Sequence, residues 1–455
     1  MPQASARRAE KQLLVTQGLA ERACELRLDD VPDHVKQIAR LALLDWYAVT
    51  WAGAKEPSVS IVRAEIEAQG GNPQARLIGS SNRTSTLGAA VVNGTAGHVL
   101  DYDDVQNILP GHATAPVAPA VLALAESIDA SGEALLLAFI AGFETTCRVG
   151  ALTSPGLFRR GYQGTTPAGA IGAAAACVKL LNLDVAAMSG ALGLAATQAS
   201  GLQAVFGSMA KCFNVGRAAQ SGLLAAQLVA RGFECTQNVL EAERGFAAVF
   251  ADGGDGAAAL GVPPGGWHLC RNLFKNYASC FMTHSPLEAL AQLRAATPFT
   301  AAEVDRLVLR VEPHFHKVVL TPPPATGLEV KFNVQHCLAL SLGGFDTGAI
   351  TTFSDELAVR PDLQALAAKC VVELDPDMVF TAAEVEVQLK NGLCLVKCVD
   401  TGEPEPDVAL STQRTAAKAR ALLTGISDAQ KNATVERFMK IETLHLAGDL
   451  HTEAV

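Results

Sequence analysis

The sequence predicts a mostly α-helical protein, in which a large all-α helical domain carries a smaller α+β lid domain as an insertion. Alanine and glycine are abundant and aromatic residues make up only 5% of the chain, which favours closely packed helices over a β-sandwich. Long apolar runs dominate up to about residue 233, and apolar and polar residues begin to alternate at Val304. The 455 residues are enough for two or three domains with a large core.

The first half of the chain has the pattern of successive helices. After a polar, helical lead-in over residues 1–30, residues 31–53 are amphipathic, with Pro32 near the start and Gly53 at the end. Residues 54–83 are rich in Gly, Asn and Ser and are expected to be loops. Further helices are predicted at 86–100, 116–128 (with Thr114 as a possible N-cap), 132–150, 167–181, 184–199 and 216–232. Small residues spaced by three and four let these helices approach closely.

The second half changes character. The glycine-rich stretch 251–261 has no preceding strand and is expected to be a loop. Alternation from Val304 predicts a strand, 332–342 a helix, and 384–399 a hairpin with positive φ at Asn391 and Gly392. An acidic, proline-rich linker at 401–407 precedes helical patterning from about Thr412. We therefore expect a helical domain over 1–269, an α+β lid over 270–402, and C-terminal helices over 403–455 that return to the helical domain.

Composition excludes several function classes. The net charge of −10 argues against a nucleic-acid partner. The eleven scattered cysteines, without a C-x-x-C, indicate reduced thiols rather than an iron–sulfur cluster. Neither a nucleotide-binding loop nor a His/Glu metal motif occurs, so no metal is expected. The N-terminus lacks a signal-length apolar stretch, and polar residues interrupt the apolar runs before they reach the length of a membrane span. We expect a cytoplasmic protein without a membrane partner.

The stretch NGTAGHVLDYDDVQNILPGHATAPVAP (93–119) concentrates acidic groups and histidines between two apolar helices. Buried carboxylates are costly unless they are paired or functional. Asp101 and Asp103 should share one side and Asp104 should face away. Close carboxylates raise one another's pKa, which would suit one of them to accept a carbon-bound proton. Alternatively, the carboxylates cap helices or pair with lysine or arginine. His112 could donate a proton or bind a carboxylate, and His98 could support an Asp.

HVLDYDD followed by GHATAPVAPAVLALAE resembles the signature of the MmgE/PrpD family, whose members include 2-methylcitrate dehydratase, cis-aconitate decarboxylase and iminodisuccinate epimerase. The resemblance implies an all-α domain with an α+β lid, a homodimer, and a small polycarboxylate substrate. It places Asp101 and His112 in the active site. It also carries over Lys211 from GSMAKCFNVGR, and Lys275, Tyr277, Cys280 and His284 from FKNYASCFMTHSP.

The segment RRGYQGTT (159–166) resembles a family motif, with Gln163 standing where relatives commonly have histidine. Arg159, Arg160, Tyr162 and Thr165 could anchor carboxylates there. Val105 replaces an expected threonine, Cys280 an expected histidine, and a tyrosine expected before TPPPATG is missing. These four departures argue against a cis-aconitate decarboxylase.

The function predicted is a cofactor-independent carbon–oxygen lyase of the dehydratase type that acts on a small di- or tricarboxylate. Asp101 or its neighbour would take a proton, His112 would protonate the leaving hydroxyl, and Lys211 would stabilise developing charge. Two alternatives stay open: an epimerase of an iminodisuccinate-like dicarboxylate, and a catalytically silent ligand-binding paralogue, which Gln163 would favour. Substrate contacts are expected from Lys275, Gln163, Tyr162, Thr165, Tyr277, Cys280 and Arg160.

Overall fold

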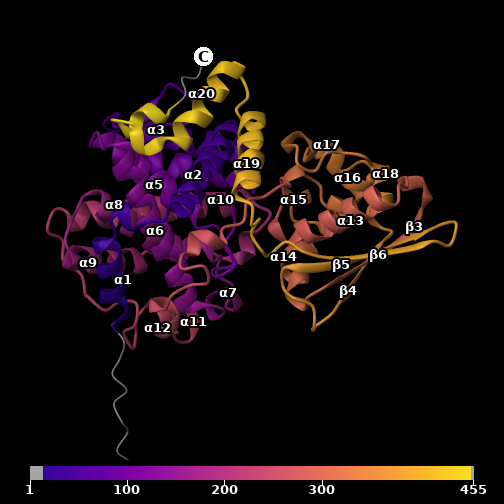
Figure 1. The fold of residues 1–455 in the computed structure, drawn as a ribbon, viewed down its shortest axis with the longest axis horizontal. Helices are drawn as coiled ribbons and strands as arrows, with labels where there is room; N and C mark the ends of the chain where they lie inside the picture. Colours follow the sequence, from indigo (N-terminus) through magenta and orange to yellow (C-terminus); the bar gives the residue numbers. More distant parts are fainter. Residues whose placement is uncertain (1–13, 452–455) are drawn as a thin grey trace, which may run out of the picture.

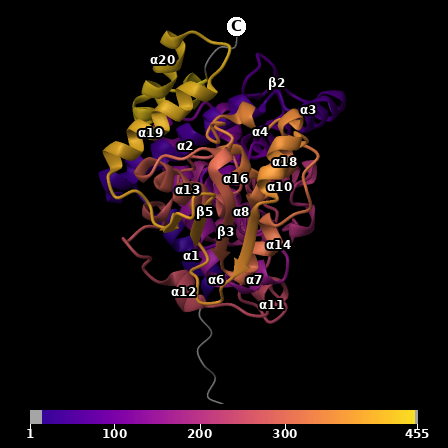
Figure 2. The same ribbon diagram turned by 90° about the vertical axis from the view of Figure 1, so that its right-hand side faces the viewer.

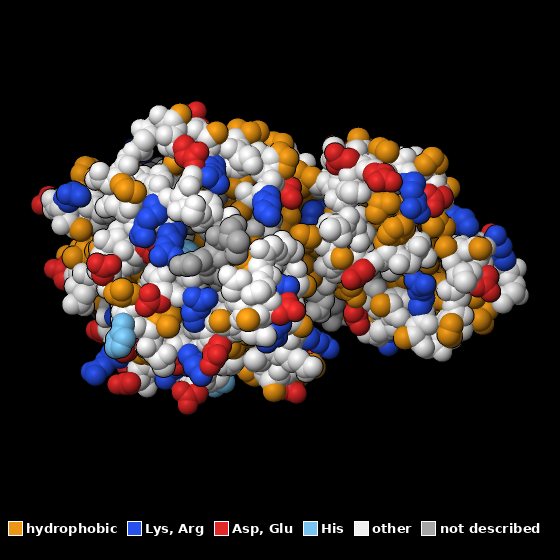
Figure 3. Space-filling view, turned by 90° about the horizontal axis from the view of Figure 1, so that it is seen from above, with side chains coloured by type: hydrophobic (Ala, Val, Ile, Leu, Met, Phe, Trp, Pro, Cys, Tyr) orange, Lys and Arg blue, Asp and Glu red, His pale blue; other side chains and the backbone are white. Residues whose placement is uncertain are grey.

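The computed structural model describes residues 14–451 and arranges them in two lobes of unequal size (Figure 1). The larger lobe is helical, and the smaller lobe contains a β-sheet covered by helices. Figure 3 shows both lobes from above, with acidic and basic side chains scattered over the visible face rather than gathered by sign.

The helical lobe contains most of the first 260 residues. A short antiparallel pair, β1 (Ala75–Arg76) and β2 (Arg83–Thr84), lies at its edge. Its helices are α1 (Val15–Glu25), α2 (Asp33–Gly53), α3 (Pro57–Gln69), α4 (Thr86–Val99), α5 (Thr114–Ser127), α6 (Gly132–Thr153), α7 (Gly156–Arg159), α8 (Thr165–Leu180), α9 (Val185–Ala196), α10 (Met209–Val229), α11 (Phe246–Ala251) and α12 (Gly256–Leu260).

Small residues let the central helices α4, α5, α6, α8 and α10 pack against one another, as their spacing predicts. A Cβ added to Gly216 of α10 would lie 2.2 Å from the carbonyl oxygen of Val91 in α4, so only glycine fits there. α6 is long and apolar enough to cross a membrane by length and composition, contrary to the expectation that no run reaches that length. However, 94% of its apolar window is buried within the protein, as in a core helix.

Three local predictions in the helical lobe were wrong. Residues 54–83 contain helix α3, which begins with Pro57 at its first turn. The N-cap of α5 is Ala113, and the Thr114 hydroxyl donates instead to Asp104. The stretch 251–261 is not only loop, because α12 forms within it and is capped by the Asp255 side chain.

The smaller lobe, which we call the lid, has a four-stranded sheet in the order β4-β3-β5-β6. β3 (Val304–Val311) pairs in parallel with β4 (Cys370–Leu374), and β5 (Ala382–Leu389) pairs antiparallel with β3 and β6 (Cys394–Asp400). α13 (His284–Ala296) packs on β5 and β6, and α16 (Val334–Leu342) packs on α13. The remaining lid helices are α14 (His316–Val319), α15 (Gly327–Val330), α17 (Asp355–Ala358) and α18 (Pro361–Ala367).

The predicted hairpin at 384–399 forms, but its turn differs from the prediction. Gly392 has a φ of 90°, whereas Asn391 is not in the positive-φ region. The Asn391 side chain instead accepts a hydrogen bond from the Leu393 amide. Asn391 therefore stabilises the turn through its side chain, and glycine alone supplies the left-handed residue.

The C-terminal helices α19 (Val408–Leu422) and α20 (Asp428–Met439) pack on α2 of the helical lobe, where Figure 2 shows them beside it. Lys418 of α19 forms an ion pair with the buried Asp45 of α2, at 2.8 Å. The chain thus crosses between the lobes twice, before α13 and after β6.

Candidate active site

The connection between α4 and α5 turns sharply at Asp101, which has a φ of 49°. Aspartate tolerates this left-handed conformation better than most residues, and such strain is common at functional sites. The turn directs the acidic side chains into the protein, where Asp101, Asp103 and Asp104 are all buried. As predicted, Asp101 and Asp103 join one group of residues while Asp104 faces away from it.

The Asp101 carboxylate binds two ammonium groups from distant segments. Its Oδ1 lies 2.8 Å from Lys275 Nζ and 3.1 Å from Lys211 Nζ. Burial disfavours the charge on Asp101, but the two lysines outweigh burial and hold the pKa of this carboxyl well below 3.8. Asp101 is therefore an anion that binds two lysines, and it is a weak proton acceptor. This is contrary to the prediction that neighbouring carboxylates raise its pKa.

The Asp103 carboxylate lies between two histidines. His98 Nδ1 is 2.9 Å and His112 Nδ1 is also 2.9 Å from Asp103 Oδ2. Burial opposes the negative charge, but His112 and His98 offset that cost and hold the pKa of Asp103 well below its usual range. Because a carboxylate only accepts, His98 Nδ1 donates to Asp103, whereas His112 Nδ1 contacts the same oxygen as an ion pair.

His98 is neutral at physiological pH, because burial lowers its pKa to about 4. With its proton on Nδ1, its Nε2 can only accept. The Gln163 side-chain amide donates to it over 3.4 Å. Gln163 therefore belongs to the site and acts on the tautomer of His98, a role that needs no proton transfer.

The other predicted residues near His112 support it in different ways. The Thr165 hydroxyl accepts a hydrogen bond from the His112 backbone amide, at 3.1 Å. The ring Nε2 of His112 is 3.7 Å from Asp101 Oδ1, beyond hydrogen-bond distance. With one nitrogen on Asp103 and the other unbound, His112 is 8% exposed and can reach a ligand.

Lys211 lies in the first turn of α10, at the accessible side of the group. Its Nζ is 4.9 Å from the ring centre of Phe332 in the lid and 5.6 Å from that of Phe206. Met209 and Phe213, on either side of Lys211 in sequence, are 49% and 39% exposed. The start of α10 therefore lies partly open to solvent. We refer to His98, Asp101, Asp103, His112, Lys211 and Lys275 as the ionic cluster.

Asp104 has a separate role. Its Oδ2 accepts hydrogen bonds from Thr114 at 2.6 Å and from Asn272 at 2.7 Å. Burial raises the pKa of Asp104 to about 8, so the group is mostly protonated at neutral pH. Asp104 thus joins the α4–α5 connection to the chain segment that leads into the lid.

Several predicted contacts lie away from the ionic cluster. Arg160 is exposed and pairs with Asp252, and Arg159 is also exposed. The ring of Tyr162 packs on Phe250, with ring centres 4.9 Å apart. Val105 forms a backbone bridge with Leu273. These placements correct the expectation that Arg160 and Tyr162 touch the substrate, because an ion pair and an aromatic contact hold them elsewhere.

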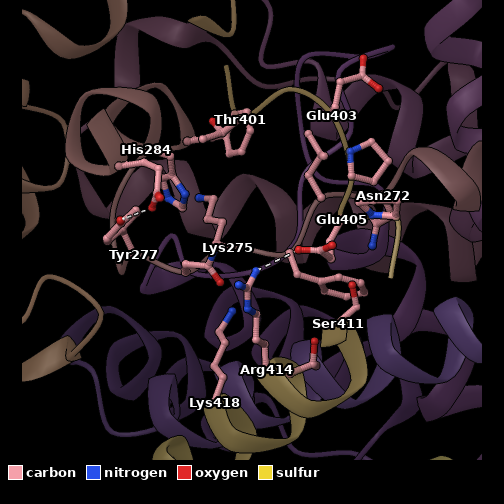
Figure 4. A pocket seen from close by; sticks show the side chains of 18 of the residues that line it. Asn272, Lys275, Tyr277, His284, Thr401, Glu403, Glu405, Ser411, Arg414 and Lys418 are labelled. Carbon is pink, nitrogen blue, oxygen red and sulfur yellow. Dashed lines mark hydrogen bonds and ion pairs between the residues drawn. The ribbon is translucent and has the colours of Figure 1, made fainter. Parts of the chain in front are cut away.

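Tyr277 and His284 line a different space, a cavity of about 840 Å³ between the lid and α19. Figure 4 shows them on one side of it, with Arg414 and Lys418 of α19 on another. The Tyr277 hydroxyl donates to Glu288 at 2.8 Å. Among the members of the ionic cluster, only Lys275 lines this cavity. Tyr277 is therefore not a neighbour of Asp101 and His112 as predicted.

Cys280 lies close enough to the ionic cluster that the charges of Asp101, Lys275 and Lys211 affect the pKa of its thiol. Burial raises the pKa of its thiol to about 11, and the Asp101 charge adds to that rise. The thiol is thus protonated at neutral pH and unsuited to nucleophilic attack. Its predicted role as a packing or substrate contact stays a prediction.

One buried lysine beside the ionic cluster, Lys331, was not predicted from the sequence. Lys331, which follows α15 directly, is buried, and its ammonium donates to the Leu100 carbonyl at 2.7 Å and the Ala278 carbonyl at 2.5 Å. With Lys211 and Lys275 it makes three ammonium groups beside the two carboxylates of Asp101 and Asp103. Because His98 is neutral, the three ammonium groups outnumber the two carboxylates, so this region carries net positive charge and suits a polyanion.

A divalent cation fits the ionic cluster poorly. Potential ligand atoms of His98, Asp101, Asp103 and His112 lie within 4.8 Å of one another. However, the Asp101 oxygen already binds two ammonium groups, which would repel a cation, and Asp103 is held by two imidazoles. The arrangement favours binding of anions.

Comparison with known proteins places these residues in context. The cis-aconitate decarboxylase of Aspergillus terreus is 29% identical over 461 residues, covering 93% of this chain and 92% of the relative. The cis-aconitate decarboxylase of Homo sapiens is 27% identical over 407 residues, covering 85% of this chain and 83% of the relative. The cis-aconitate decarboxylase of Mus musculus is 26% identical over 408 residues, covering 85% of this chain and 82% of the relative.

These relatives overturn one prediction. The departures at Val105, Gln163 and Cys280, with the missing tyrosine before TPPPATG, had argued against a decarboxylase, yet the relatives that align over most of the chain are named decarboxylases. The structure gives a physical reason for the error at two positions. Val105 contributes a backbone bridge, and Gln163 keeps a hydrogen bond to the neutral His98.

Family profiles account for most of the chain. The MmgE/PrpD N-terminal domain matches residues 17–257, which include His98, Asp101, Asp103, His112 and Lys211. The MmgE/PrpD C-terminal domain matches residues 277–441, which include the lid and α19. The chain therefore belongs to the MmgE/PrpD family.

Proposed function

We propose that this protein is a carboxy-lyase that removes CO2 from a small unsaturated tricarboxylate of the cis-aconitate type. The observation that carries the proposal is the convergence of Lys211, Lys275 and His112 on two buried carboxylates. The names of the relatives from A. terreus and H. sapiens supply the reaction class. The net positive charge of the region supplies the preference for a substrate with several carboxylates.

The two lysines have different tasks in this proposal. Lys275 Nζ already donates to Asp101 O at 2.7 Å, Asp101 Oδ1 at 2.8 Å and Ser279 O at 3.2 Å. An ammonium has three protons, so Lys275 is saturated and serves to hold Asp101 in place. Lys211 Nζ contacts the same carboxylate at 3.1 Å and has no other polar contact among the described residues, and Lys211 is 7% exposed. Lys211 therefore retains donors for a substrate carboxylate.

Loss of CO2 breaks a carbon–carbon bond and leaves its electron pair on the substrate. That pair delocalises into the double bond and a neighbouring carboxylate, where negative charge grows in the transition state. Lys211, held by Asp101 and by the rings of Phe206 and Phe332, is positioned to stabilise this charge without reorganising.

The reaction then needs one proton on carbon. His112 has its Nδ1 on Asp103, so its Nε2 is the nitrogen that faces a ligand. A proton on Nε2 passes to the carbanion and leaves a neutral ring, which regains a proton from solvent, to which the residue is 8% exposed. Asp103 and His98 keep the ring oriented through this cycle.

The test is incubation of the purified protein with cis-aconitate, citrate, 2-methylcitrate and iminodisuccinate, with CO2 release and proton NMR of the products as readouts. We expect CO2 and an unsaturated dicarboxylate from the unsaturated tricarboxylate only. Inversion of iminodisuccinate without CO2 release would overturn the proposal in favour of an epimerase. Binding without turnover of any compound would indicate a silent ligand-binding protein.

Two variants complete this test. Lys211→Met should lower kcat/KM by at least about 100-fold, because it removes a charge that both binds substrate and stabilises the transition state. Arg217→Met is the matched control, because Arg217 is an exposed cation two turns further along α10. It should leave kcat/KM within about twofold. Equal losses in both variants would contradict the role given to Lys211.

A further inference from the structure

Lys331 is a buried cation with no part in the steps above. It is 4% exposed, and its Nζ lies 4.6 Å from the ring centre of Phe353. All of its described hydrogen bonds go to backbone carbonyls, one in the helical lobe at Leu100 and one in the lid at Ala278. Burying an ammonium without a contacting carboxylate is costly, so this position calls for a physical reason.

The contacts of Lys331 parallel those of Lys275. Lys275 donates to the carbonyls of Asp101 and Ser279, and Lys331 donates to the preceding carbonyls, those of Leu100 and Ala278. Two adjacent peptide units of the helical lobe are thereby joined to two adjacent peptide units of the lid. In addition, the backbone carbonyl of Lys331 accepts from the Cys280 amide at 3.0 Å. We call these two lysines and four carbonyls the lysine clamp.

The clamp acts at the point where the site is strained. Leu100 is the C-cap of α4, and the next residue, Asp101, is the one with positive φ. A cation at a helix C-terminus stabilises the last carbonyls, which have no partner within the helix. Lys331 therefore fixes the peptide from which Asp101 turns toward Lys211 and Lys275.

We propose that Lys331 is a positioning residue for catalysis, which holds Asp101 in its left-handed conformation and docks the lid on the helical lobe without touching the substrate. This inference rests on the proposed function for its kinetic consequence only. Its structural consequence, a tighter Leu100–Asp101 peptide, applies whatever the substrate is.

The charges around Lys331 come from four segments. Asp101 follows α4, Lys275 lies in the segment before α13, Glu56 precedes α3, and Cys337 lies in α16. Burial lowers the pKa of Lys331 to about 8, with Asp101 opposing that shift and Lys275 adding to it. The ammonium is thus charged at neutral pH and loses its proton as the pH rises through about 8, which weakens the clamp on the basic side.

The experiment compares Lys331→Met with Lys179→Met in the full-length protein. Lys179 is the matched control, because its ammonium also donates to two backbone carbonyls, those of Cys24 and Leu26, in the helical lobe. Lys331→Met should lower kcat by about tenfold or more while KM changes by less than about twofold. The kcat of wild type should fall near pH 8, and the profile of Lys331→Met should lack that fall. Lys179→Met should keep the wild-type kcat and pH profile.

Amide hydrogen exchange gives a readout that needs no substrate. In Lys331→Met, amides of residues 98–104 should exchange at least about tenfold faster than in wild type, while those of α6 stay unchanged. Unchanged exchange at 98–104 would overturn the proposal, as would a rise in KM with kcat intact. If wild type turns over no substrate, the proposed function fails. The positioning role of Lys331 is then tested by amide hydrogen exchange at residues 98–104 alone.

A second variant keeps the inference testable if Lys331→Met does not fold. Phe353→Leu leaves the lysine in place but removes the ring 4.6 Å from its ammonium. A lower kcat with unchanged KM and faster exchange at 98–104 would support the clamp. Wild-type kcat and exchange in Phe353→Leu would overturn it.

Discussion

Replacement of Lys275 by methionine tests whether the buried ion pair at Asp101 is as important as its geometry implies. Lys275 is 1% exposed and is the only residue described that joins the Asp101 carboxylate, the Asp101 carbonyl and the Ser279 carbonyl. Methionine keeps the length of the side chain and removes the charge. The substitution leaves Asp101 buried with a single ammonium, that of Lys211.

The expected loss in the free energy of unfolding follows from the number of ammonium groups that remain at Asp101. Removing one partner of a buried ion pair typically costs about 3–5 kcal/mol, and because Lys211 remains we expect the lower end, about 3 kcal/mol. Asp101→Asn in the Lys275→Met background removes the buried charge that has lost one of its two partners and should restore at least ~1 kcal/mol. The double variant should therefore be more stable than the single one.

Urea denaturation followed by circular dichroism measures these differences at pH 7. The low pKa of Asp101 in wild type provides stability that is full above the unfolded pKa, about 4, and is lost as the pH falls below it. For that reason, the difference in the free energy of unfolding between wild type and Lys275→Met should become smaller at acidic pH. A Lys275→Met protein within ~1 kcal/mol of wild type at pH 7, or a double variant less stable than the single, would refute the reasoning.

Three further outcomes are expected. Treatment with EDTA should leave CO2 release within about twofold, because ammonium groups occupy the Asp101 oxygen; recovery of lost activity by a divalent cation would contradict this. Arg160→Ala should keep KM within about twofold, because Arg160 pairs with Asp252 at the surface; a tenfold rise would place it at the substrate after all. Gly216→Val should lower the free energy of unfolding by about 2 kcal/mol or more, because its Cβ would meet the Val91 carbonyl; an unchanged melting temperature would show that α4 and α10 can separate.

Helices with unbroken apolar patterning were predictable, and elements that depend on distant partners were not. α2, α4, α6, α8 and the β5–β6 hairpin lie where the sequence predicts them. β4 escaped prediction because Cys370–Leu374 is short and depends on its parallel partner β3. α3 was missed because glycine and asparagine around it outweighed its own pattern. The domain boundaries, the homodimer and the cytoplasmic location stay predictions.

In the site, the sequence predicted the motif around Asp101 and His112, but it did not predict the pKa values of the acidic residues in that motif. Resemblance to a family located Lys211 and Lys275, and the structure brings both to Asp101. The pKa values of Asp101 and Asp103 fall, because lysines and histidines outweigh burial, whereas burial raises the pKa of Asp104. Lys331 left no trace in the sequence, since nothing in LEVKFN distinguishes a buried lysine from an exposed one.

Decarboxylation in deuterated water tests the central claim most directly, namely that His112, oriented by Asp103, puts one proton on the delocalised carbanion that remains after CO2 leaves. Wild type should release CO2 from cis-aconitate and place one deuterium at a single carbon of the product, and His112→Asn should lose at least ~100-fold in rate. A His112→Asn protein that releases CO2 at the wild-type rate with the same deuterium content would contradict the account.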